Sequence, residues 1–314
     1  MSKQIAIVFP GQGSQSVGML AELAAAQPLV EATFAEASAV LGMDLWHLVS
    51  QGPKELLDRT DLTQPAMLTA GVAVWRVWQA AGGPQPAWLA GHSLGEFTAL
   101  VCADALGFAD AVALVVQRGR FMQEAVPPGA GAMAAILGLP DDQVAAACEE
   151  AAQGQVLAPV NYNSPGQVVI AGEAAAVERG IAAAKARGAK RAVPLPVSVP
   201  SHCALMRHAA ERLAVALAAV DIAAPRIPVL HNASVDTAQT PEAIRERLVR
   251  QLYSPVRWVE TVRRLGDAGV TRVIEAGPGK VLAGLTKRID DRLEGLAVFD
   301  PKGLAAALEA TQHD

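Results

Sequence analysis

One short segment of the chain has the residue types of a serine nucleophile. Residues 91–95 read Gly-His-Ser-Leu-Gly and fit the Gly-x-Ser-x-Gly elbow, in which a serine lies on a strained turn between a strand and a helix. The pattern often occurs by chance, but an apolar, strand-like segment precedes it and Glu96–Ala103 suits a helix. We predict that the Ser93 hydroxyl attacks a carbonyl carbon, with the Leu94 N–H aimed at the carbonyl oxygen.

A serine nucleophile needs a base, and histidine is the usual one. The six histidines are His47 and His208 in helical patterns, His92 in the elbow with its side chain directed away from the serine, His202, His231, and His313 in the tail. His202 and His231 are therefore the candidates. We favour His202, because it lies in a loop where the chain re-enters a large domain, and catalytic groups collect in such loops. A histidine that is merely hydrogen-bonded in its loop stays an alternative.

An acid that would orient the histidine is not evident. An α/β-hydrolase places such an acid between serine and histidine in chain order. Asp104, Asp110, Asp141 and Asp142 are available there, but all fall in helix or helix-start patterns. The absence of an obvious triad acid counts against an ordinary esterase.

Two further segments have residues suited to binding an acyl group. Residues 9–15, Phe-Pro-Gly-Gln-Gly-Ser-Gln, follow an apolar strand. Glycines let a backbone approach a ligand closely, so the Gln12 N–H is a candidate second oxyanion donor; a plain tight turn is the alternative. Arg118 lies on an apolar helix that begins near Phe108, where an arginine is usually solvated. If it faces inward, a substrate carboxylate suits it, because guanidinium binds carboxylates with two parallel hydrogen bonds.

The elements that must position these residues follow an α/β pattern. Strand-like runs at Ile5–Phe9 and Ala87–Ala90 are each followed by helical patterns, which reach about residues 82 and 125. The same rhythm resumes after Pro200, with strands at Val229–His231 and Val270–Glu275. This alternation predicts a mainly parallel sheet covered by helices.

The middle of the chain has a different order of elements. Its expected segments are strand Ala132–Leu137, helix Asp141–Ala152, strands Val156–Val160 and Val168–Ala171 joined by a turn at 163–166, helix Ala174–Arg187, and strand Lys190–Leu195. This βαββαβ order is the ferredoxin-like split motif. We therefore predict a large α/β domain of residues 1–127 and 197–314, interrupted by a small ferredoxin-like domain of residues 128–196.

Composition limits the classes of protein that fit. The chain of 314 residues is 52% hydrophobic and 18% charged, enough for a large core and a second, smaller domain. Its net charge of -5 argues against a nucleic-acid partner. Its three cysteines are far apart in sequence and predict reduced thiols. No segment suits a signal peptide, and the apolar stretch Ala99–Val116 contains two aspartates, which a membrane span rarely tolerates. We expect a cytoplasmic protein that does not bind membranes.

Together these segments resemble the malonyl-CoA:acyl carrier protein transacylases of fatty-acid synthesis. The motifs are residues 9–15, Thr-Gln-Pro-Ala at 63–66, Gly-His-Ser-Leu-Gly-Glu at 91–96, Gln-Arg-Gly-Arg-Phe-Met-Gln at 117–123, Val-Pro-Ser-His-Cys at 199–203, Gln-Leu-Tyr-Ser-Pro-Val-Arg-Trp at 251–258 and Glu-Ala-Gly-Pro-Gly at 275–279. Each motif alone is modest. Their common order and spacing over nearly the whole chain are highly specific.

The resemblance implies an α/β-hydrolase-like large domain with a ferredoxin-like insert. It implies that Ser93 is acylated, that His202 is its base, and that the backbone amides of Gln12 and Leu94 form the oxyanion hole. It also implies that Arg118 holds the malonyl carboxylate. No metal or tightly held cofactor is implied, and the expected partners are malonyl-CoA and acyl carrier protein.

The resemblance also accounts for the missing acid. The family uses a backbone carbonyl, here that of Gln251, to orient the histidine. Gln64 and the stretch Asn161–Asn163 match the family's pocket less securely. A serine thioesterase or hydrolase, a related acyltransferase of polyketide synthesis or malonate decarboxylation, and a carrier-protein docking subunit with a vestigial site remain alternatives.

Overall fold

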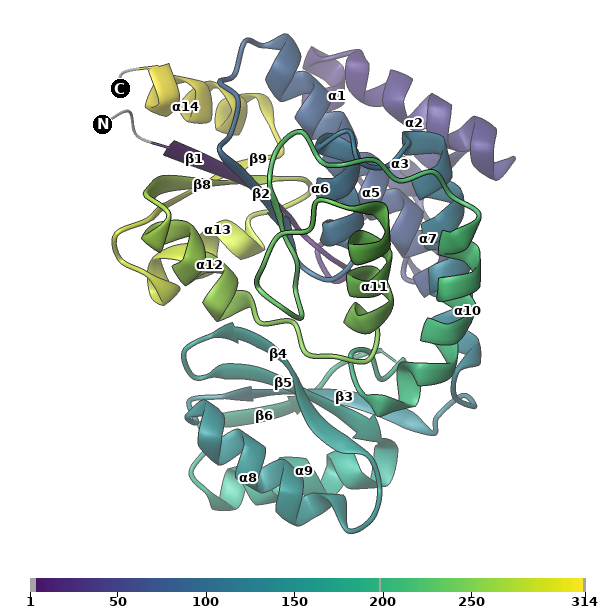
Figure 1. The fold of residues 1–314 in the computed structure, drawn as a ribbon, viewed down its shortest axis with the longest axis vertical. Helices are drawn as coiled ribbons and strands as arrows, with labels where there is room; N and C mark the ends of the chain where they lie inside the picture. Colours follow the sequence, from purple (N-terminus) through teal and green to yellow (C-terminus); the bar gives the residue numbers. More distant parts are fainter. Residues whose placement is uncertain (1–3, 198, 313–314) are drawn as a thin grey trace.

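The computed structural model describes residues 4–197 and 199–312, and its strands form two sheets (Figure 1). The larger sheet is parallel, in the order β7-β2-β1-β8-β9, and the smaller is antiparallel, in the order β4-β5-β3-β6. The strands are β1 (Gln4–Phe9), β2 (Trp88–Gly91), β3 (Gly131–Leu137), β4 (Leu157–Ser164), β5 (Gln167–Glu173), β6 (Arg191–Pro194), β7 (Val229–Leu230), β8 (Val270–Ala276) and β9 (Glu294–Val298). The mixed α/β class predicted from the sequence is confirmed.

Helices cover both faces of the larger sheet and one face of the smaller sheet. They are α1 (Ala21–Ala26), α2 (Leu29–Leu41), α3 (Leu45–Gln51), α4 (Lys54–Leu57), α5 (Thr60–Ala80), α6 (Gly95–Cys102), α7 (Phe108–Glu124), α8 (Asp141–Ala152), α9 (Ala174–Ala186), the 3-10 helix η1 (Ala204–Met206), α10 (Arg207–Ala218), α11 (Pro241–Gln251), α12 (Trp258–Asp267), α13 (Val281–Ile289) and α14 (Pro301–Gln312). In β1, Ile7 belongs to the core under α5, α6 and α7, whereas Val8 belongs to the core under α12 and α13. Alternate residues of a strand point to opposite faces, so a strand covered on both sides is apolar throughout.

The smaller sheet and its two helices form the ferredoxin-like insert. The chain order β3-α8-β4-β5-α9-β6 and the sheet order match that motif. α8 and α9 pack on the face turned away from the larger sheet (Figure 1). On the opposite face, Met133 and Val160 pack against Cys203 of the larger domain. The insert therefore presents one face of its sheet to the loop that carries His202.

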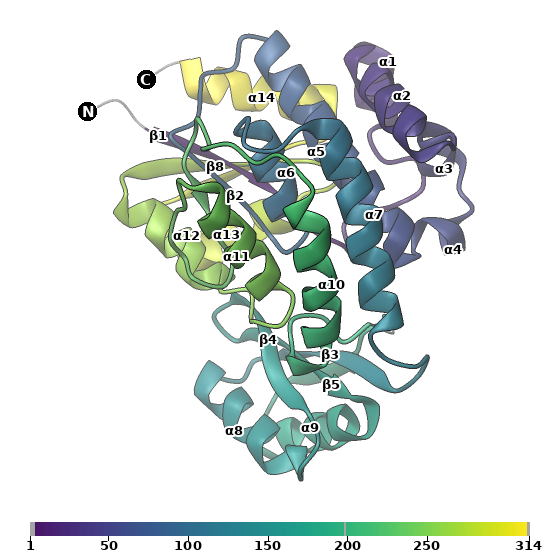
Figure 2. The ribbon, with the colours of Figure 1, turned by 45° about the vertical axis from the view of Figure 1, so that its right-hand side comes forward.

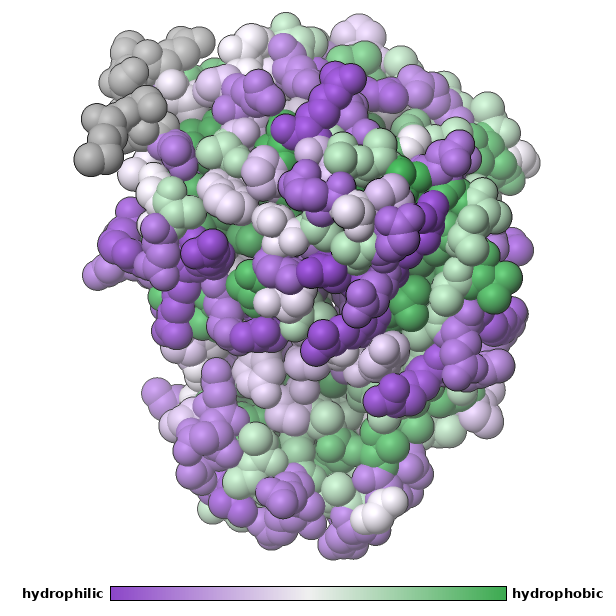
Figure 3. Space-filling view, in the orientation of Figure 1, coloured by the Kyte–Doolittle hydropathy of each residue, from purple (hydrophilic) through white to green (hydrophobic). Residues whose placement is uncertain are grey.

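The insert is also joined to the larger domain by main-chain hydrogen bonds. The N–H of Tyr162 donates to the carbonyl of Val256 (3.0 Å), and the N–H of Val256 donates to the carbonyl of Val160 (2.8 Å). These bonds attach β4 to the chain that follows α11, and Figure 2 shows β4 below that helix. On the face shown in Figure 3, hydrophilic residues cover much of the upper part, and a hydrophobic patch lies toward the lower part, over the insert.

The main differences from the sequence-based boundaries lie at β4 and at the C-terminal elements. β4 continues through Ser164, so the predicted turn at 163–166 is shorter than expected, because Tyr162 and Ser164 pair with Val168 and Gln167 of β5. β9 and α14 were not predicted. β9 is an edge strand of five residues with only one fully buried side chain, Val298, and such a strand carries a weak hydrophobic pattern.

Candidate active site

The turn from β2 into α6 holds Ser93 in a strained backbone conformation. Its φ is +52°, in the left-handed region that residues other than glycine seldom adopt. A Cβ at Gly91 would overlap the main chain of Gly95, and a Cβ at Gly95 would overlap the carbonyl oxygen of Phe9. Strand, turn and helix therefore pack main chain against main chain, which only glycine permits. The predicted strand–turn–helix elbow is present.

Ser93 is paired with His202. The serine Oγ lies 2.7 Å from His202 Nε2, and His202 Nδ1 lies 2.8 Å from the main-chain oxygen of Gln251. A carbonyl oxygen only accepts hydrogen bonds, so Nδ1 carries the ring hydrogen and Nε2 presents its lone pair to the serine. This arrangement suits removal of the serine proton, with the Gln251 carbonyl fixing the tautomer.

The surroundings of His202 keep its ring neutral. The side chain is 3% exposed, and burial, followed by the nearby charge of Arg118, lowers its pKa to about 3. Burial removes the water that would solvate an imidazolium, and the guanidinium repels it. The main chain is also fixed, because the His202 N–H donates to the carbonyl of Leu252 at 3.0 Å. At neutral pH the ring is therefore in the form that a base requires.

The structure separates the two histidines that the sequence left as candidates. His231 directly follows β7 and is buried. Its Nδ1 lies 2.7 Å from Glu96 Oε1, so its side chain is paired with Glu96, whereas His202 is paired with the serine hydroxyl. His47 and His208 are exposed on helices, and His313 lies outside the described residues. His92 Nε2 lies 2.8 Å from Asn163 Oδ1, so its ring is bound to the insert. The preference for His202 agrees with this geometry.

Two backbone amides near the serine have no acceptor. Among the described residues, neither the Gln12 N–H nor the Leu94 N–H donates to a protein atom. Leu94 is the N-cap of α6, so its amide lies at the positive end of a helix. Both residues line the same cavity as Ser93. Free amides beside a nucleophile can bind the oxygen that becomes negative when a carbonyl is attacked.

Arg118 is buried inside this site. The sequence allowed either a solvated arginine or one that faces inward, and the structure shows the inward-facing one. Its side chain is 1% exposed. Nη1 donates to Gln64 Oε1 (2.9 Å), Nη2 donates to Gln251 Oε1 (2.9 Å), and Nη2 also lies 3.4 Å from Ser93 Oγ. Each Nη nitrogen carries two hydrogens, so donors remain for a ligand next to the serine. Burial lowers the pKa of the guanidinium to about 10, and Glu96 opposes this shift.

Below the elbow lies a layer of polar side chains that the sequence did not single out. Asn232 Oδ1 accepts the Ser93 N–H at 2.6 Å, and Asn232 Nδ2 donates to the carbonyl of Gly91 at 2.6 Å. Glu96 accepts the Asn232 N–H and the Gln251 Nε2 hydrogen, each at 2.9 Å. One signal was available, because Glu96 is the only charged residue in the otherwise apolar α6.

The cavity at Ser93 is small and is closed on one side by the insert. Its volume is about 120 Å³. It is lined by Gln12, His92, Ser93, Leu94, Arg118, Met122, Met133, Asn161, Leu195, Val197, Val199, Ser201 and His202. Asn161 Oδ1 is buried there without a partner among the described residues. The insert thus contributes Met133 and Asn161 to the site, and Asn163 fixes His92.

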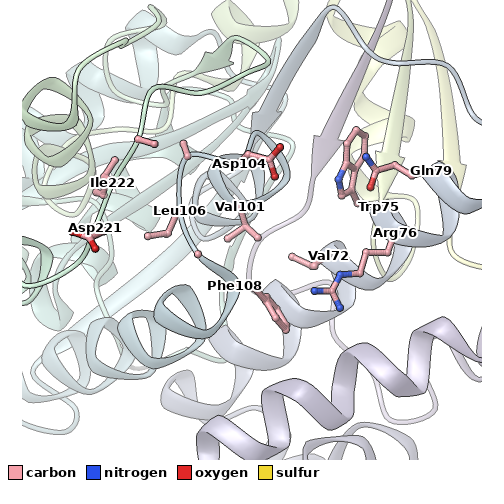
Figure 4. Close-up of a pocket in the computed structure, with 13 residues that line it drawn as sticks. Val72, Trp75, Arg76, Gln79, Val101, Asp104, Leu106, Phe108, Asp221 and Ile222 are labelled. Carbon is pink, nitrogen blue, oxygen red and sulfur yellow. The ribbon is translucent and has the colours of Figure 1, made fainter.

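A larger hollow lies elsewhere in the molecule and lacks the groups for this chemistry. It has a volume of about 600 Å³ and lies between α5, α7 and the chain around Ile222 (Figure 4). None of its lining residues is a serine, cysteine, histidine or lysine. Its arginine, Arg76, is paired with Glu36 and lies over the ring of Phe108. Size alone therefore does not identify the chemical site.

Three other features of the described residues bear on the sequence-based expectations. No group of three or more His, Cys, Asp or Glu side chains in them is arranged to hold a metal ion, and none of their helices is long and apolar enough to cross a membrane. Cys102, Cys148 and Cys203 are free and buried, and burial raises the pKa of the Cys203 thiol to about 11.

Comparisons with known proteins identify the family. The family model of the acyl transferase domain matches residues 6–295. The malonyl CoA-acyl carrier protein transacylase of Escherichia coli K12 is 63% identical over 98% of this chain and 99% of its own. An acyl carrier protein S-malonyltransferase from Vibrio cholerae is 60% identical, with a TM-score of 0.95 over 97% of this chain and 99% of its own.

A third similar structure is a malonyl-transacylase in complex with a type II PKS acyl-carrier protein, 59% identical, with a TM-score of 0.97 over 98% of this chain and 100% of its own. These matches extend over nearly the full length of every chain compared. The chain belongs to the malonyl CoA-acyl carrier protein transacylase family of acyl transferases.

Proposed function

We propose that this chain transfers the malonyl group of malonyl-CoA to the phosphopantetheine thiol of an acyl carrier protein in fatty-acid synthesis, through a malonyl ester of Ser93. One observation carries the proposal: Ser93 Oγ lies 2.7 Å from a neutral imidazole nitrogen and 3.4 Å from a buried guanidinium. A nucleophile, a base and a carboxylate-binding cation therefore converge on one cavity. The names of the relatives support the same substrates.

In the first half-reaction, Ser93 Oγ attacks the thioester carbonyl carbon of malonyl-CoA. His202 Nε2 accepts the serine proton as the new C–O bond forms. The carbonyl oxygen becomes negative, and the free N–H groups of Gln12 and Leu94 stabilise it. The C–S bond then breaks, the sulfur takes the proton from His202, and coenzyme A leaves as the thiol. The enzyme retains a malonyl ester on Ser93.

The second half-reaction reverses these steps with a different thiol. The phosphopantetheine thiol of the carrier protein gives its proton to His202 Nε2 and attacks the ester carbonyl carbon. The oxyanion again lies between the two amides, the C–O bond to Ser93 breaks, and the serine oxygen regains the proton. One residue thus serves as base and acid in both directions, the pattern of covalent ping-pong catalysis.

Arg118 supplies the selectivity for a malonyl group. Nη1 keeps one hydrogen beyond the one given to Gln64, and Nη2, besides its bond to Gln251, makes only a long 3.4 Å contact to Ser93 Oγ. A carboxylate two bonds from the attacked carbonyl is held there while Ser93 reacts. A buried guanidinium favours a carboxylate ligand, because the ion pair between them forms out of water.

The coenzyme A thioester is a substrate in this scheme, and no cofactor takes part in it. We also propose a cytoplasmic location, which the three free, buried thiols support. One relative is named with a carrier protein of polyketide synthesis, so the fatty-acid pathway is itself part of the proposal. The domain limits at residues 127/128 and 196/197 also stay predictions.

The test is mass spectrometry of the enzyme after brief exposure to malonyl-CoA. We expect one malonyl adduct, located on Ser93 and absent from Ser93→Ala. Addition of holo acyl carrier protein should yield malonyl carrier protein, whereas a thioesterase would yield free malonate. An adduct that persists in Ser93→Ala, or one on Cys203, would overturn the assignment.

A further inference from the structure

The charge of Arg118 is buried without a carboxylate in direct contact. Among the residues that the structure describes, its hydrogen-bond acceptors are the amide oxygens of Gln64 and Gln251 and the hydroxyl of Ser93, all neutral. Its Nε is buried with no partner in the same set. A fully buried charge is costly unless an opposite charge balances it. The sequence offered no internal carboxylate for this role.

A buried carboxylate of unexplained purpose lies nearby. The side chain of Glu96 is fully buried, and it accepts hydrogen bonds from His231 Nδ1 (2.7 Å), the Asn232 N–H (2.9 Å) and Gln251 Nε2 (2.9 Å). Amide donors solvate a carboxylate but do not cancel its charge. Of the three donors, only His231 is able to carry a positive charge.

His231 is poorly placed to be that cation. Its Nε2 is buried and has no hydrogen-bond partner among the described residues. If the ring were protonated, Nε2 would be a buried, charged N–H group without an acceptor. In the neutral ring Nε2 carries only a lone pair, which is much less costly to bury without a partner. The geometry fits a neutral ring that donates from Nδ1 to Glu96. The negative charge of Glu96 is then left for another cation to balance. Glu96 acts to raise the pKa of two arginines, Arg118 and Arg247, and Arg247 is already paired with Asp236.

Gln251 connects the two unbalanced charges. Its Oε1 accepts from Arg118 Nη2 at 2.9 Å, and its Nε2 donates to Glu96 Oε2 at 2.9 Å. The carboxylate thereby fixes which end of the amide faces the guanidinium. Glu96 also acts to raise the pKa of Arg118 against the effect of burial. One neutral side chain thus separates a buried anion from a buried cation.

We infer that Glu96 is the counter-charge of Arg118, acting across the Gln251 amide as a positioning residue. The inference rests on the proposed function for its purpose. A carboxylate bound directly to Arg118 would occupy the hydrogens that a substrate carboxylate needs. Placed one amide away, Glu96 balances the charge of the empty site and leaves to a substrate carboxylate those Arg118 hydrogens that are not given to Gln64 and Gln251.

The test is a double-mutant cycle measured by urea unfolding of the full chain: wild type, Glu96→Gln, Arg118→Met and the double variant. In the wild-type background, Glu96→Gln should lower the equilibrium constant for folding by on the order of a hundredfold, because it leaves a buried charge unbalanced. In the Arg118→Met background, Glu96→Gln should lower the equilibrium constant for folding by less than about tenfold, or should raise it. Equal losses in both backgrounds would overturn the inference.

Folding failure is also informative in this design. If Glu96→Gln is insoluble, the double variant should be soluble; a double variant that fails as well would show that the carboxylate is needed irrespective of Arg118. The matched control is Glu275→Gln, since Glu275 is equally buried but binds the start of α13. Its effect should be the same with and without Arg118→Met.

Malonate binding gives a second measurement that separates this inference from the proposed function. Without Glu96, the ligand becomes the counter-charge, so malonate should bind Glu96→Gln on the order of tenfold more tightly than wild type. Weaker binding would contradict the inference. If malonate binds wild type without any dependence on Arg118, the proposed substrate is wrong, although the unfolding cycle can still show coupling. If malonate binding depends on Arg118 but the free-energy changes of Glu96→Gln and Arg118→Met are additive, the counter-charge inference is wrong and the proposed substrate stands.

Discussion

Replacement of Arg118 by alanine tests how the site distinguishes malonyl from acetyl groups. The two thioesters differ by one carboxylate, which lies away from the attacked carbonyl. Arg118 is 1% exposed, and its Nη2 is 3.4 Å from Ser93 Oγ. In the proposed mechanism, the malonyl carboxylate binds this guanidinium, whereas an acetyl group makes no contact that requires the charge.

The expected size of the effect follows from burial. Removing one partner of a buried ion pair costs about 3–5 kcal/mol, which at ~1.36 kcal/mol per decade is about two to four decades in rate constant. Arg118→Ala should lose that much kcat/KM for malonyl-CoA. Acetyl transfer should be unchanged or faster, because the wild-type site holds an acetyl group beside a guanidinium without a carboxylate ligand.

The assay compares kcat/KM for malonyl-CoA and acetyl-CoA in the same enzyme preparation. Their ratio cancels any loss of folded enzyme, which matters because the variant leaves Glu96 without its partner. Arg120 is the matched control: it lies on the same helix, two positions along, and is exposed, so Arg120→Ala should leave the ratio unchanged. Equal losses for both thioesters in Arg118→Ala would refute the reasoning and make the residue structural.

Three further predictions follow from the structure. Because burial lowers the pKa of His202 to about 3 from the usual 6.5, the neutral base persists as pH falls, and the acid limb of kcat/KM should lie below about pH 5; a limb centred near 6.5 would contradict this environment. Gly95→Ala should destabilise the fold by about 3 kcal/mol or more, because its Cβ overlaps the carbonyl oxygen of Phe9. The exposed helical position Gly284 has open space, so Gly284→Ala should stabilise by ~1 kcal/mol in the same urea experiment.

Sequence patterns were sufficient where local residues decide the structure. The helix predicted at Asp141–Ala152 has those bounds in the structure, because an apolar stripe and a preceding proline define it. The elbow was also predictable, since its glycines and serine are adjacent in sequence and a strand and a helix flank them. The βαββαβ order of the insert followed from the change in hydrophobic period and from the turn residues at 163–166.

The polar layer beneath the elbow was beyond such patterns. Glu96 and His231 are 135 positions apart in the chain, and Gln251 Nε2 reaches Glu96 from 155 positions away. Apart from the isolated charge of Glu96 in α6, nothing local distinguishes these side chains from solvated ones, because their partners become neighbours only after the sheet has assembled. Arg118 shows the same limit: its helix suited a solvated or a buried arginine, and only the folded partners decide between them.

The use of a carbonyl in place of a carboxylate at His202 fits transfer better than hydrolysis. Burial and the charge of Arg118 lower the pKa of His202, and a carbonyl offsets this effect less than a carboxylate would, so His202 is a weak base in the proposed mechanism. Thiols have a pKa near 8.5 and water has one of about 15.7, so a weak base deprotonates an attacking thiol far more readily. Acylation of Ser93 by a thioester is the reverse of attack by a thiol, and the same weak base serves it through the same transition state. The histidine's environment thereby favours exchange between thiols over loss of the acyl group to water.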